Sequence, residues 1–581
     1  NMLLISRDQA RSRRMPQRAP TRGGEQELEP IWIKNYPPGV PATVELDAAD
    51  TLVSLAENSF REYADRPSFA CMGRTLSYRE LDQMSRAFAA WLQQSGLEPG
   101  TRIAIMLPNV LQFPVALFGA LRAGLTVVNV NPLYTARELE HQLTDSGAEA
   151  IVILANFASV LEKVIDRTSV RTVIVTEFGD LLGFPKAFIV NTVLRYVKKM
   201  VPAYDLPGHW RFSEILAEGR PMSHSPVALD GDSLAFLQYT GGTTGPSKGA
   251  MLTHGSVRAN VEQMMAWTET YTEPGKEVII TALPLYHIFA LVCNCMCFFR
   301  TGGLNVLIPN PRDVPGFVKE MSRWDFTVIF GVNTLFNALL AEESFSQLDF
   351  SKLKMSGGGG MAVQSAVAER WHSITGSLLQ EGYGLTECSP VVSMNPREQS
   401  ELYTGTVGLP LPSTEISVRD DAGKELPLGE RGELCVRGPQ VMKGYWRRES
   451  ATAETFHADG FLRTGDVATI DERGYVSIVD RAKDMVLVSG FNVYPCEVEE
   501  VVTQLDGVLE AACIGVPDEK STEAVKVFVV PEPGRELDRD TVLAWCREQM
   551  TAYKVPKHIE FRDELPKTNV GKILRRALRE A

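Results

Sequence analysis

Short apolar runs alternate with helical stretches along most of the chain. Residues 77–109 show this pattern clearly, with an amphipathic helix, a turn that contains glycine, and an apolar strand. Similar apolar runs recur within 126–132, 148–154 and 171–176. Such runs are typical of strands that are buried on both faces of a largely parallel sheet. The pattern therefore predicts an α/β fold, in which a large N-terminal domain holds layered, doubly covered β-sheets and helices.

The pattern changes near the end of the chain. Residues 474–502 predict a strand, a charged turn, a second strand and a helix that begins near Pro495. The strands and helices that follow suffice for a small, separate α+β domain. We therefore predict four segments, which are a basic tail at 1–30, a large N-terminal domain at 31–479, a hinge at 480–485 and a small C-terminal domain at 486–581.

Composition excludes several classes of protein. The chain has 581 residues and a net charge of −13, which argues against bulk binding of nucleic acid. Its nine cysteines show no C-x-x-C or His-x-His spacing, so neither a zinc site nor a disulfide framework is predicted. Cys293, Cys295 and Cys297 lie in an apolar run and are expected to be buried, reduced thiols in a reducing compartment.

The first thirty residues differ from the rest in charge. Six arginines and one acidic residue lie within 1–24, and no apolar segment of a secretory signal accompanies them. An arginine-rich start is also typical of a transit peptide. The alternative that we favour is a disordered tail, because globular patterning begins near Ile31.

The segment 181–204 is amphipathic and contains no acidic residue before Asp205. At about 100° per residue, one arc of this helix is apolar and the opposite arc is basic. The apolar arc holds Val190, Val193, Leu194, Val197 and Val201, and the basic arc holds Asn191, Arg195, Lys198 and Lys199. Two interpretations stay open, a helix that docks on anionic lipid through 184–201 and a helix packed on the protein with a solvated basic face.

A glycine-rich loop at 239–254, YTGGTTGPSKGAMLTH, indicates polyphosphate binding. It differs from the P-loop, because Ser247 precedes Lys248 and Gly249 follows it. Glycines let backbone N–H groups approach phosphate oxygens, while hydroxyls and an ammonium group balance their charge. Three later motifs add further groups. Tyr383 could stack on a base, Glu387 could bind a metal ion, and Asp466 could accept hydrogen bonds from ribose. Lys572, near the end of the chain, is a cation that could neutralise charge on a transferring group.

These motifs, in this order, resemble the adenylate-forming superfamily of acyl-CoA synthetases, luciferases and adenylation domains. The resemblance runs from about residue 31 to 581, and among the members of this superfamily the chain is most similar to bacterial long-chain fatty-acid–CoA ligases. It rests on eight ordered motifs, among them QYTGGTTGPSKGAMLTH, LPLYHIFAL, EGYGLTECSPVVSMNP, GELCVRGPQVMKGYW and FRDELPKTNVGKILRR.

The resemblance implies a role for particular residues. Thr240 and Glu387 would hold Mg²⁺, and Lys572 would be the catalytic lysine that bridges carboxylate and α-phosphate oxygens. The ATP-binding set would comprise Thr240, Gly241, Gly242, Thr243, Thr244, Gly245, Lys248, Gly358, Gly359, Glu381, Gly382, Tyr383, Thr386, Asp466, Arg481 and Lys483. His287, Gly331 and Val332 would border the acyl pocket, and Ser489 and Gly490 would bind CoA after the C-terminal domain swings about the hinge.

The implied activity is a two-step ligation of a long-chain fatty acid to CoA. ATP activates the acid to acyl-AMP with release of pyrophosphate, and the CoA thiol then displaces AMP. No acidic residue interrupts the stretches around His287 and Val332, and an apolar tunnel fits a fatty acid better than an amino acid. The alternatives are transfer to a carrier protein, a membrane-associated sensor of lipid and nucleotide, and an oxidative, luciferase-like reaction. The expected location is cytoplasmic, partly peripheral on the inner face of the membrane.

Overall fold

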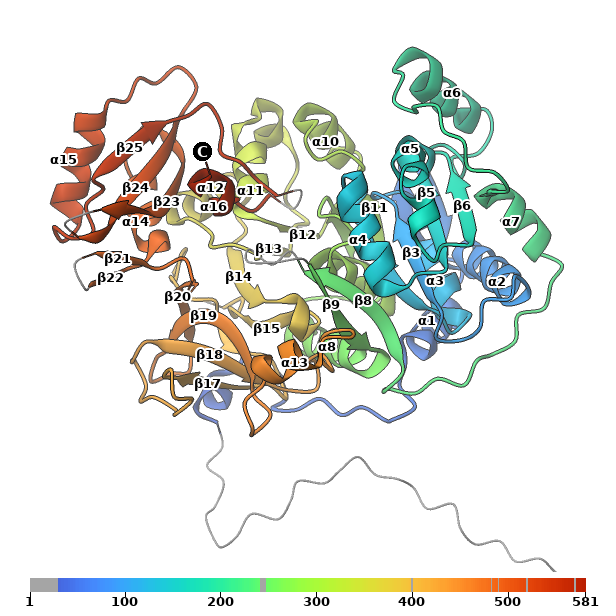
Figure 1. Cartoon of the computed structure of the whole chain (residues 1–581), viewed down its shortest axis with the longest axis horizontal. Helices are drawn as coiled ribbons and strands as arrows, with labels where there is room; N and C mark the ends of the chain where they lie inside the picture. Colours follow the sequence, from blue (N-terminus) through green and yellow to red (C-terminus); the bar gives the residue numbers. More distant parts are fainter. Residues whose placement is uncertain are drawn as a thin grey trace, which may run out of the picture.

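The computed structural model describes residues 30–240, 247–398, 401–481, 483–488, 491–518, 521–568 and 571–580. Within these ranges the strands form sheets of nine, seven, five and four strands (Figure 1). The two large sheets and their helices make up the first two thirds of the chain. The four-stranded sheet follows, and the five-stranded sheet with its helices forms a separate lobe at the end of the chain (Figure 1). The predicted α/β class, with layered sheets and a smaller C-terminal unit, is confirmed.

The seven-stranded sheet has the order β7-β6-β5-β3-β4-β8-β9 and is parallel except for the β8–β9 pair. Its strands are β3 (Arg102–Met106), β4 (Thr126–Asn129), β5 (Ala150–Leu154), β6 (Thr172–Thr176), β7 (Trp210–Arg211), β8 (Leu234–Thr240) and β9 (Lys248–Thr253). Every residue of β5 is buried, and alternate side chains face two different cores. Val152 lies in one core while Ile151 and Ile153 lie in the other, as expected for a strand covered on both faces.

The nine-stranded sheet has the order β16-β15-β14-β13-β12-β10-β11-β1-β2. Its strands are β1 (Pro67–Cys71), β2 (Arg74–Ser77), β10 (Val278–Thr281), β11 (Leu304–Leu307), β12 (Val328–Gly331), β13 (Met355–Gly358), β14 (Leu379–Gly384), β15 (Val391–Met394) and β16 (Leu409–Pro410). The run from β1 to β14 is parallel, and antiparallel strands close both edges. The ends of β12, β13 and β14 therefore lie together at one edge of the sheet, where ligands bind in such folds.

Helices fill the space between the large sheets and cover their outer faces. The chief buried cluster includes side chains from α1 (Leu52–Glu62), α2 (Tyr78–Gln94), α3 (Gln112–Arg122), α7 (Phe212–Gly219), α8 (His254–Thr268), η5 (Ala290–Met296) and α9 (Cys297–Arg300). The outer helices include α4 (Ala136–Ser146), α5 (Ala158–Glu162), α10 (Val314–Met321), α11 (Asn333–Ala341) and α12 (Ser365–Thr375). Short helical turns are η1 (Ile31–Asn35), η2 (Ala155–Phe157), η3 (Ile165–Arg167), η6 (Glu343–Gln347) and η7 (Thr386–Cys388). The predicted burial of Cys293, Cys295 and Cys297 is confirmed.

The four-stranded sheet is an antiparallel meander of β17 (Glu415–Arg419), β18 (Gly432–Arg437), β19 (Leu462–Ile470) and β20 (Val476–Arg481), flanked by α13 (Glu449–Thr455). The C-terminal lobe contains β21 (Val486–Val488), β22 (Phe491–Val493), β23 (Val508–Asp518), β24 (Thr522–Pro531) and β25 (His558–Phe561). Its helices are α14 (Pro495–Thr503), α15 (Arg539–Gln549) and α16 (Arg575–Arg579). The predicted start of a helix near Pro495 is confirmed, because proline at the first helical position lacks only an N–H that would be unpaired.

The amphipathic segment near residue 190 folds as α6 (Lys186–Thr192) followed by the π-helical turn η4 (Val193–Val197). The predicted apolar arc is partly wrong, because Val190 and Val201 pack against the protein while Val193 and Val197 are exposed. Arg195, expected on a solvated face, pairs with Glu177 at 2.5 Å. No helix in the described ranges is long and apolar enough to cross a bilayer.

Candidate active site

A pocket lies where β12, β13 and β14 end. Its lining combines backbone of the glycine-rich strands β13 and β14, apolar side chains from η5 and β15, and one lysine from the C-terminal lobe. The predicted site residues on its lining are His287, Gly358, Gly359, Gly382, Tyr383, Thr386 and Lys572. Residues more than two hundred positions apart in the sequence thus meet in one cavity.

The glycines of this pocket are required by close packing. A Cβ on Gly358 would lie 2.5 Å from Val363, and one on Gly384 would lie 2.2 Å from the carbonyl oxygen of Pro390. A Cβ on Gly359 would lie 3.1 Å from the carbonyl oxygen of Gly382. Because the strands leave no room for side chains here, the pocket wall is backbone, and a flat ring can approach it closely.

Asp466 lies beside the pocket and is held by two partners. The hydroxyl of Tyr383 donates a hydrogen bond of 2.5 Å to Oδ2, and Nε of Arg481 lies 3.2 Å from Oδ1. Asp466 and Arg481 are opposite one another in the β19–β20 pair. The backbone N–H of Asp466 donates to Oγ1 of Thr464 at 3.1 Å. Burial and the neighbouring Asp466 carboxylate raise the pKa of Tyr383, so the phenol stays a hydrogen-bond donor.

Lys572 reaches the pocket from a tight turn of the C-terminal lobe. Its N–H donates to Oγ1 of Thr568 at 3.0 Å, and its carbonyl oxygen accepts from the N–H of Thr568 at 2.6 Å. Gly571 in this turn has a φ of 84°, and its carbonyl oxygen accepts a hydrogen bond of 3.3 Å from the hydroxyl of Thr334 on α11. The turn is therefore in direct contact with the large domain.

The electrostatic surroundings of Lys572 weaken its hold on a proton. Desolvation lowers the pKa of the ammonium group to about 8, and the nearby Arg481 acts in the same direction. The carboxylates of Asp466 and Glu387 oppose this shift. The lysine is thus still mostly charged at neutral pH, in a place where the charge is poorly solvated and interacts strongly with an anion.

His287 lines the pocket as a neutral imidazole. Burial lowers its pKa to about 3, and the charge of Lys572 acts in the same direction. Its Nδ1 accepts a hydrogen bond of 3.4 Å from the N–H of Phe289. This bond assigns the ring proton to Nε2, which makes His287 a neutral donor toward a ligand.

Glu387, Thr240 and Lys248 are connected through Tyr445, a residue to which the sequence analysis gave no role. The Tyr445 hydroxyl donates a hydrogen bond of 2.7 Å to Oε1 of Glu387. Nζ of Lys248 lies 5.0 Å from the centre of the Tyr445 ring, and Lys248 is opposite Thr240 in the β8–β9 pair. Tyr445 belongs to a motif quoted for the resemblance, so that motif was the available signal.

Besides Asp466, Arg481, Glu387, Thr240 and Lys248, four further predicted site residues lie outside the pocket lining. Glu381 is buried behind it, where Oε1 accepts a hydrogen bond of 2.8 Å from the N–H of Val363, and burial raises the pKa of Glu381 to about 8. Val332 packs against the turn of Lys572, since a Cβ on Gly571 would lie 3.0 Å from it. Gly331 is also closely packed, since a Cβ on it would lie 2.8 Å from the ring of Phe336. Lys483 is exposed just after β20.

Seven predicted residues fall outside the described ranges, namely Gly241, Gly242, Thr243, Thr244, Gly245, Ser489 and Gly490. Their phosphate and CoA roles stay predictions. The apolar lining, by contrast, was largely missed by the sequence analysis and includes Met264, Phe289, Cys293, Phe330, Val391 and Met394. In the sequence these positions resemble ordinary core residues of strands and helices, so no local signal separated them from the core.

The model of the AMP-binding enzyme family matches residues 56–446. The chain belongs to this family. A second model, that of the C-terminal domain of AMP-binding enzymes, matches residues 497–572, a range that ends at Lys572. The two matches cover the pocket and the lobe that delivers the lysine.

Individual AMP-binding enzymes resemble the chain over almost its whole length. It is 56% identical to a long-chain-fatty-acid–CoA ligase of Yersinia pestis, with 95% of this chain and 98% of the relative covered. The corresponding ligase of Bacillus subtilis is 36% identical over 94% of this chain and 97% of its own length. Among solved structures, anthranilate CoA ligase AuaEII in complex with anthranoyl-AMP has a TM-score of 0.82 at 25% identity, over 92% of this chain and 98% of its own.

Proposed function

We propose that the chain is an AMP-forming long-chain fatty-acid–CoA ligase. The observation that carries this proposal is the pocket itself, which joins an apolar lining to the neutral donor His287 and the poorly solvated ammonium of Lys572. A fatty acid has the same two parts, an alkyl chain and a carboxylate. The curated relatives named long-chain-fatty-acid–CoA ligase support the proposal at 56% and 36% identity.

In the first step, a carboxylate oxygen bonds to the α-phosphorus of ATP, and the bond from that phosphorus to the bridging oxygen breaks. Acyl-AMP forms and pyrophosphate leaves. Two anions must approach each other, so the charge of Lys572 stabilises the transition state electrostatically rather than by covalent chemistry. The backbone wall of Gly358 and Gly359 would accept the adenine ring, and Asp466 would accept hydrogen bonds from the ribose hydroxyls.

In the second step, the CoA sulfur bonds to the acyl carbon and AMP leaves as its bond to that carbon breaks. The thiol proton is released to solvent, and the products are acyl-CoA and AMP. We assign CoA binding to Ser489 and Gly490, and the change between steps to movement of the C-terminal lobe about residues 480–485. These assignments rest on the resemblance stated above.

The oxygen donors of Thr240 and Glu387 fit Mg²⁺, which prefers hard oxygen ligands. Within the described residues, Tyr445 bonds Oε1 of Glu387, so Oε2 remains available to a cation. When bound there, the ion would neutralise phosphate charge. Tyr445 orients the carboxylate, and Lys248 adds a second positive charge beside the same ring.

A product assay tests the proposal. Purified protein with oleate, ATP, Mg²⁺ and CoA is expected to yield oleoyl-CoA, AMP and pyrophosphate in equal amounts, quantified by mass spectrometry. Formation of ADP and orthophosphate would contradict it. A parallel reaction with a phosphopantetheinylated carrier protein in place of CoA distinguishes the carrier-loading alternative, and ATP–pyrophosphate exchange without any thioester would indicate an enzyme that stops at the adenylate.

We also propose that the enzyme docks on the inner face of the cytoplasmic membrane through a surface that we call the α6 patch. This patch consists of exposed apolar side chains on α6 and η4 and next to them, namely Phe184, Phe188, Ile189, Val193, Tyr196, Val197 and Met200. Phe184 is 90% exposed and Tyr196 71% exposed, which is unusual for aromatic rings on a soluble surface. Lys198 and Lys199 are exposed at the edge of the patch, where they suit anionic lipid headgroups.

Sedimentation with vesicles tests this docking. The double variant Phe184→Ser, Phe188→Ser is expected to lose most binding to vesicles that contain phosphatidylglycerol, because its inserted apolar area is reduced. Leu428→Ser is the matched control, since Leu428 is another exposed apolar residue, at 50%, in the loop before β18. Equal sedimentation of the double variant and the control would overturn the proposal.

A further inference from the structure

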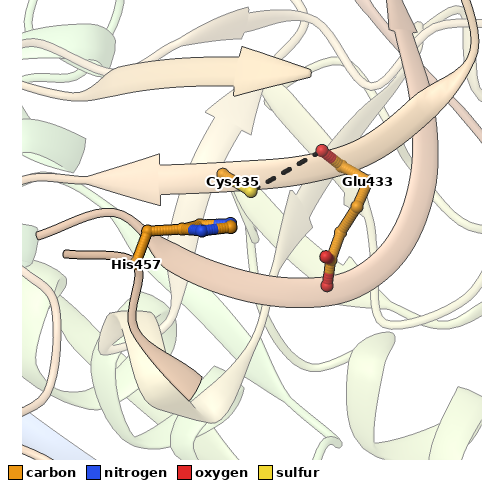
Figure 2. A group of neighbouring side chains, drawn as sticks. All are labelled: Glu433, Cys435 and His457. Atoms are coloured by element: carbon orange, nitrogen blue, oxygen red, sulfur yellow. Dashed lines mark hydrogen bonds between the residues drawn. The ribbon is translucent and has the colours of Figure 1, made fainter. Parts of the chain in front are cut away.

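A cluster of three metal-ligating side chains lies on the four-stranded sheet, outside the pocket. Glu433 and Cys435 are on β18, and His457 is in the loop between α13 and β19 (Figure 2). Residues two apart on a strand point to the same face, so the carboxylate and the thiol share one side of the sheet. One ligand atom from each residue lies within 4.8 Å of the others. Among the described residues this is the one group of three or more such side chains found at that spacing.

The histidine of this cluster has an unsatisfied nitrogen. Nε2 of His457 is buried and has no hydrogen-bond partner among the described residues. A buried polar atom without a partner is costly, and such an atom in a native protein calls for an explanation. The imidazole ring faces Cys435 and Glu433 in Figure 2. A bound cation would satisfy this nitrogen.

The loop around His457 fixes the position of the ring. The N–H of His457 donates to the carbonyl oxygen of Phe461 at 2.8 Å, and its own carbonyl oxygen accepts from the N–H of Gly460 at 2.9 Å. A Cβ on Gly423 would lie 3.1 Å from Cε1 of His457, so the ring is packed closely against that glycine. The imidazole is therefore held toward the sheet by its backbone and its neighbour.

We propose that Glu433, Cys435 and His457 bind Zn²⁺. Sulfur, imidazole nitrogen and carboxylate oxygen are the three ligand types that zinc prefers, and three protein ligands leave a fourth position for water. With bonds of about 2.0–2.3 Å, tetrahedral ligand atoms lie roughly 3.3–3.8 Å apart, a spacing that small movements of these side chains from their present separation, within 4.8 Å, would reach. On binding, the Cys435 thiol loses its proton to solvent and coordinates as the thiolate.

Two existing contacts of Glu433 fit this role. Its Oε2 accepts a hydrogen bond of 2.9 Å from Nε of Arg463, and its Oε1 accepts one of 3.1 Å from the N–H of Gly465. Each carboxylate oxygen has a further lone pair, so the group can coordinate a cation while it keeps one of these bonds. Hydrogen bonds of this kind orient a ligating carboxylate.

The same contacts connect the cluster to the pocket. Gly465 directly precedes Asp466, whose carboxylate is bonded to Tyr383 and Arg481. Movement of Glu433 toward zinc would lengthen its bond to Gly465 and shift the backbone that carries Asp466. Zinc occupancy is therefore expected to weaken AMP binding, and this consequence, unlike the zinc site itself, rests on the proposed function.

Metal binding is tested on the full-length chain after chelation and desalting. The protein is titrated with Co²⁺, and the thiolate-to-cobalt charge-transfer absorption is recorded; Zn²⁺ then displaces the cobalt and is quantified by atomic emission. We expect about one equivalent per chain, and a loss of affinity of at least about tenfold in Cys435→Ser and in His457→Gln, because each removes a direct ligand. Glu433→Gln should weaken binding while the charge-transfer absorption remains.

The chain offers two matched controls. Cys546→Ser removes a buried cysteine on α15. His372→Gln removes another histidine with a buried ring nitrogen, Nδ1, for which the described residues offer no hydrogen-bond partner. Both controls are expected to bind zinc as the unsubstituted chain does. Circular dichroism of the metal-free variants checks that they are folded. If Cys435→Ser or His457→Gln fails to fold, Glu433→Gln still tests the site, because the Glu433 side chain is only partly buried.

The outcomes separate the two proposals. If Cys435→Ser and His457→Gln bind zinc like the controls, or if no thiolate absorption appears, the zinc site is overturned. AMP titration of zinc-loaded and zinc-free protein then tests the coupling to Asp466. Failure of AMP to bind in either state would count against the proposed ligase function, whereas the measured metal stoichiometry would still decide whether the cluster binds zinc.

Discussion

The two sides of the pocket are built differently. The wall around Gly358 and Gly359 is backbone of central sheet strands, packed so closely that no side chain fits. Lys572 on the other side stands on a turn of the C-terminal lobe, and the hydrogen bond from Thr334 to Gly571 ties that turn to the large domain. Under the proposed function, the difference means that the surface for the nucleotide is preorganised, whereas the charge of Lys572 is supplied by a separate lobe.

The delivering part is rigid within itself. Arg575, three residues after Lys572, lies 2.8 Å from Glu499, 3.5 Å from Asp484 and 3.8 Å from Asp480. Arg579 adds a contact of 2.9 Å to Asp484. The carboxylates at 480 and 484 belong to the predicted hinge, so α16 connects the hinge to the turn of Lys572. The lysine and hinge are expected to move as one unit.

The largest effect should follow from removing the delivered charge. Lys572→Ala is expected to lower the rate of adenylation by about 10²–10³, because it removes one well-placed electrostatic stabiliser. ATP affinity should change little, since the preorganised wall is intact. Fatty-acid-dependent ATP–pyrophosphate exchange measures the first quantity and equilibrium dialysis the second. A large loss of ATP affinity with unchanged exchange would instead show that Lys572 acts in ATP binding and not in adenylation.

A smaller effect should follow from a substitution of Asp466, beside the preorganised wall of the pocket. Asp466→Asn weakens charge-assisted hydrogen bonds, each worth about 1.5–3 kcal/mol, so ATP affinity is expected to fall by about 10- to 100-fold. The variant should still reach most of its maximal adenylation rate at saturating ATP. Initial rates over a range of ATP concentrations separate KM from kcat. A loss confined to kcat would show that Asp466 acts in the transition state instead.

The pH dependence of activity tests the charge of Lys572 without altering its side chain. Lys572 must be protonated to act, and its pKa is lowered to about 8, so activity should be present below pH 8 and lost above it. From about pH 7 to pH 9 the protonated fraction falls roughly tenfold, and kcat/KM should fall with it. In Lys572→Arg, whose charge persists, the alkaline decline should disappear. The same decline in both proteins would exclude Lys572 as its cause.

The smallest effect concerns the contact between the two sides. Thr334→Val removes the hydrogen bond to Gly571 at nearly constant volume, a loss of about 0.5–1.5 kcal/mol. Adenylation is expected to slow about two- to tenfold, because the turn docks less often. Thioester formation from preformed acyl-AMP should be unaffected. Single-turnover kinetics measures the rate of each step. Equal slowing of both steps would contradict the idea that docking of the Lys572 turn serves adenylation alone.

Much of the fold could be predicted, because its strands are buried on both faces. Runs such as that of β5 are apolar at every position, whereas an amphipathic surface helix alternates apolar and polar residues. The division into two large sheets and the order of their strands could not be predicted, since both depend on contacts between distant segments. Pocket residues such as Phe330 were missed for the same reason, because they become lining only where β12, β13 and β14 end side by side.

The segment around Val193 shows where periodicity fails. A constant turn of about 100° per residue predicted its faces, but a π-helical turn adds a residue and rotates all that follows. After this turn Val201 packs inward while Val197 is exposed, so the two do not share one face. The π-helical turn does not account for the residues before it, where Val190 packs inward while Phe184 and Phe188 are exposed. The prediction of an amphipathic helix was right, and its phase was wrong.

Glu381 gives the nucleotide slot an uncharged backing. With a pKa of about 8, this carboxyl group is mostly protonated at neutral pH, and it places no negative charge behind a wall that faces a polyanion. Its pKa in an unfolded chain is near 4.3, so the folded form binds an extra proton between these values. The free energy of unfolding should accordingly fall as the medium becomes alkaline through this interval, and the native enzyme is set to tolerate mild acid better than mild base at that position.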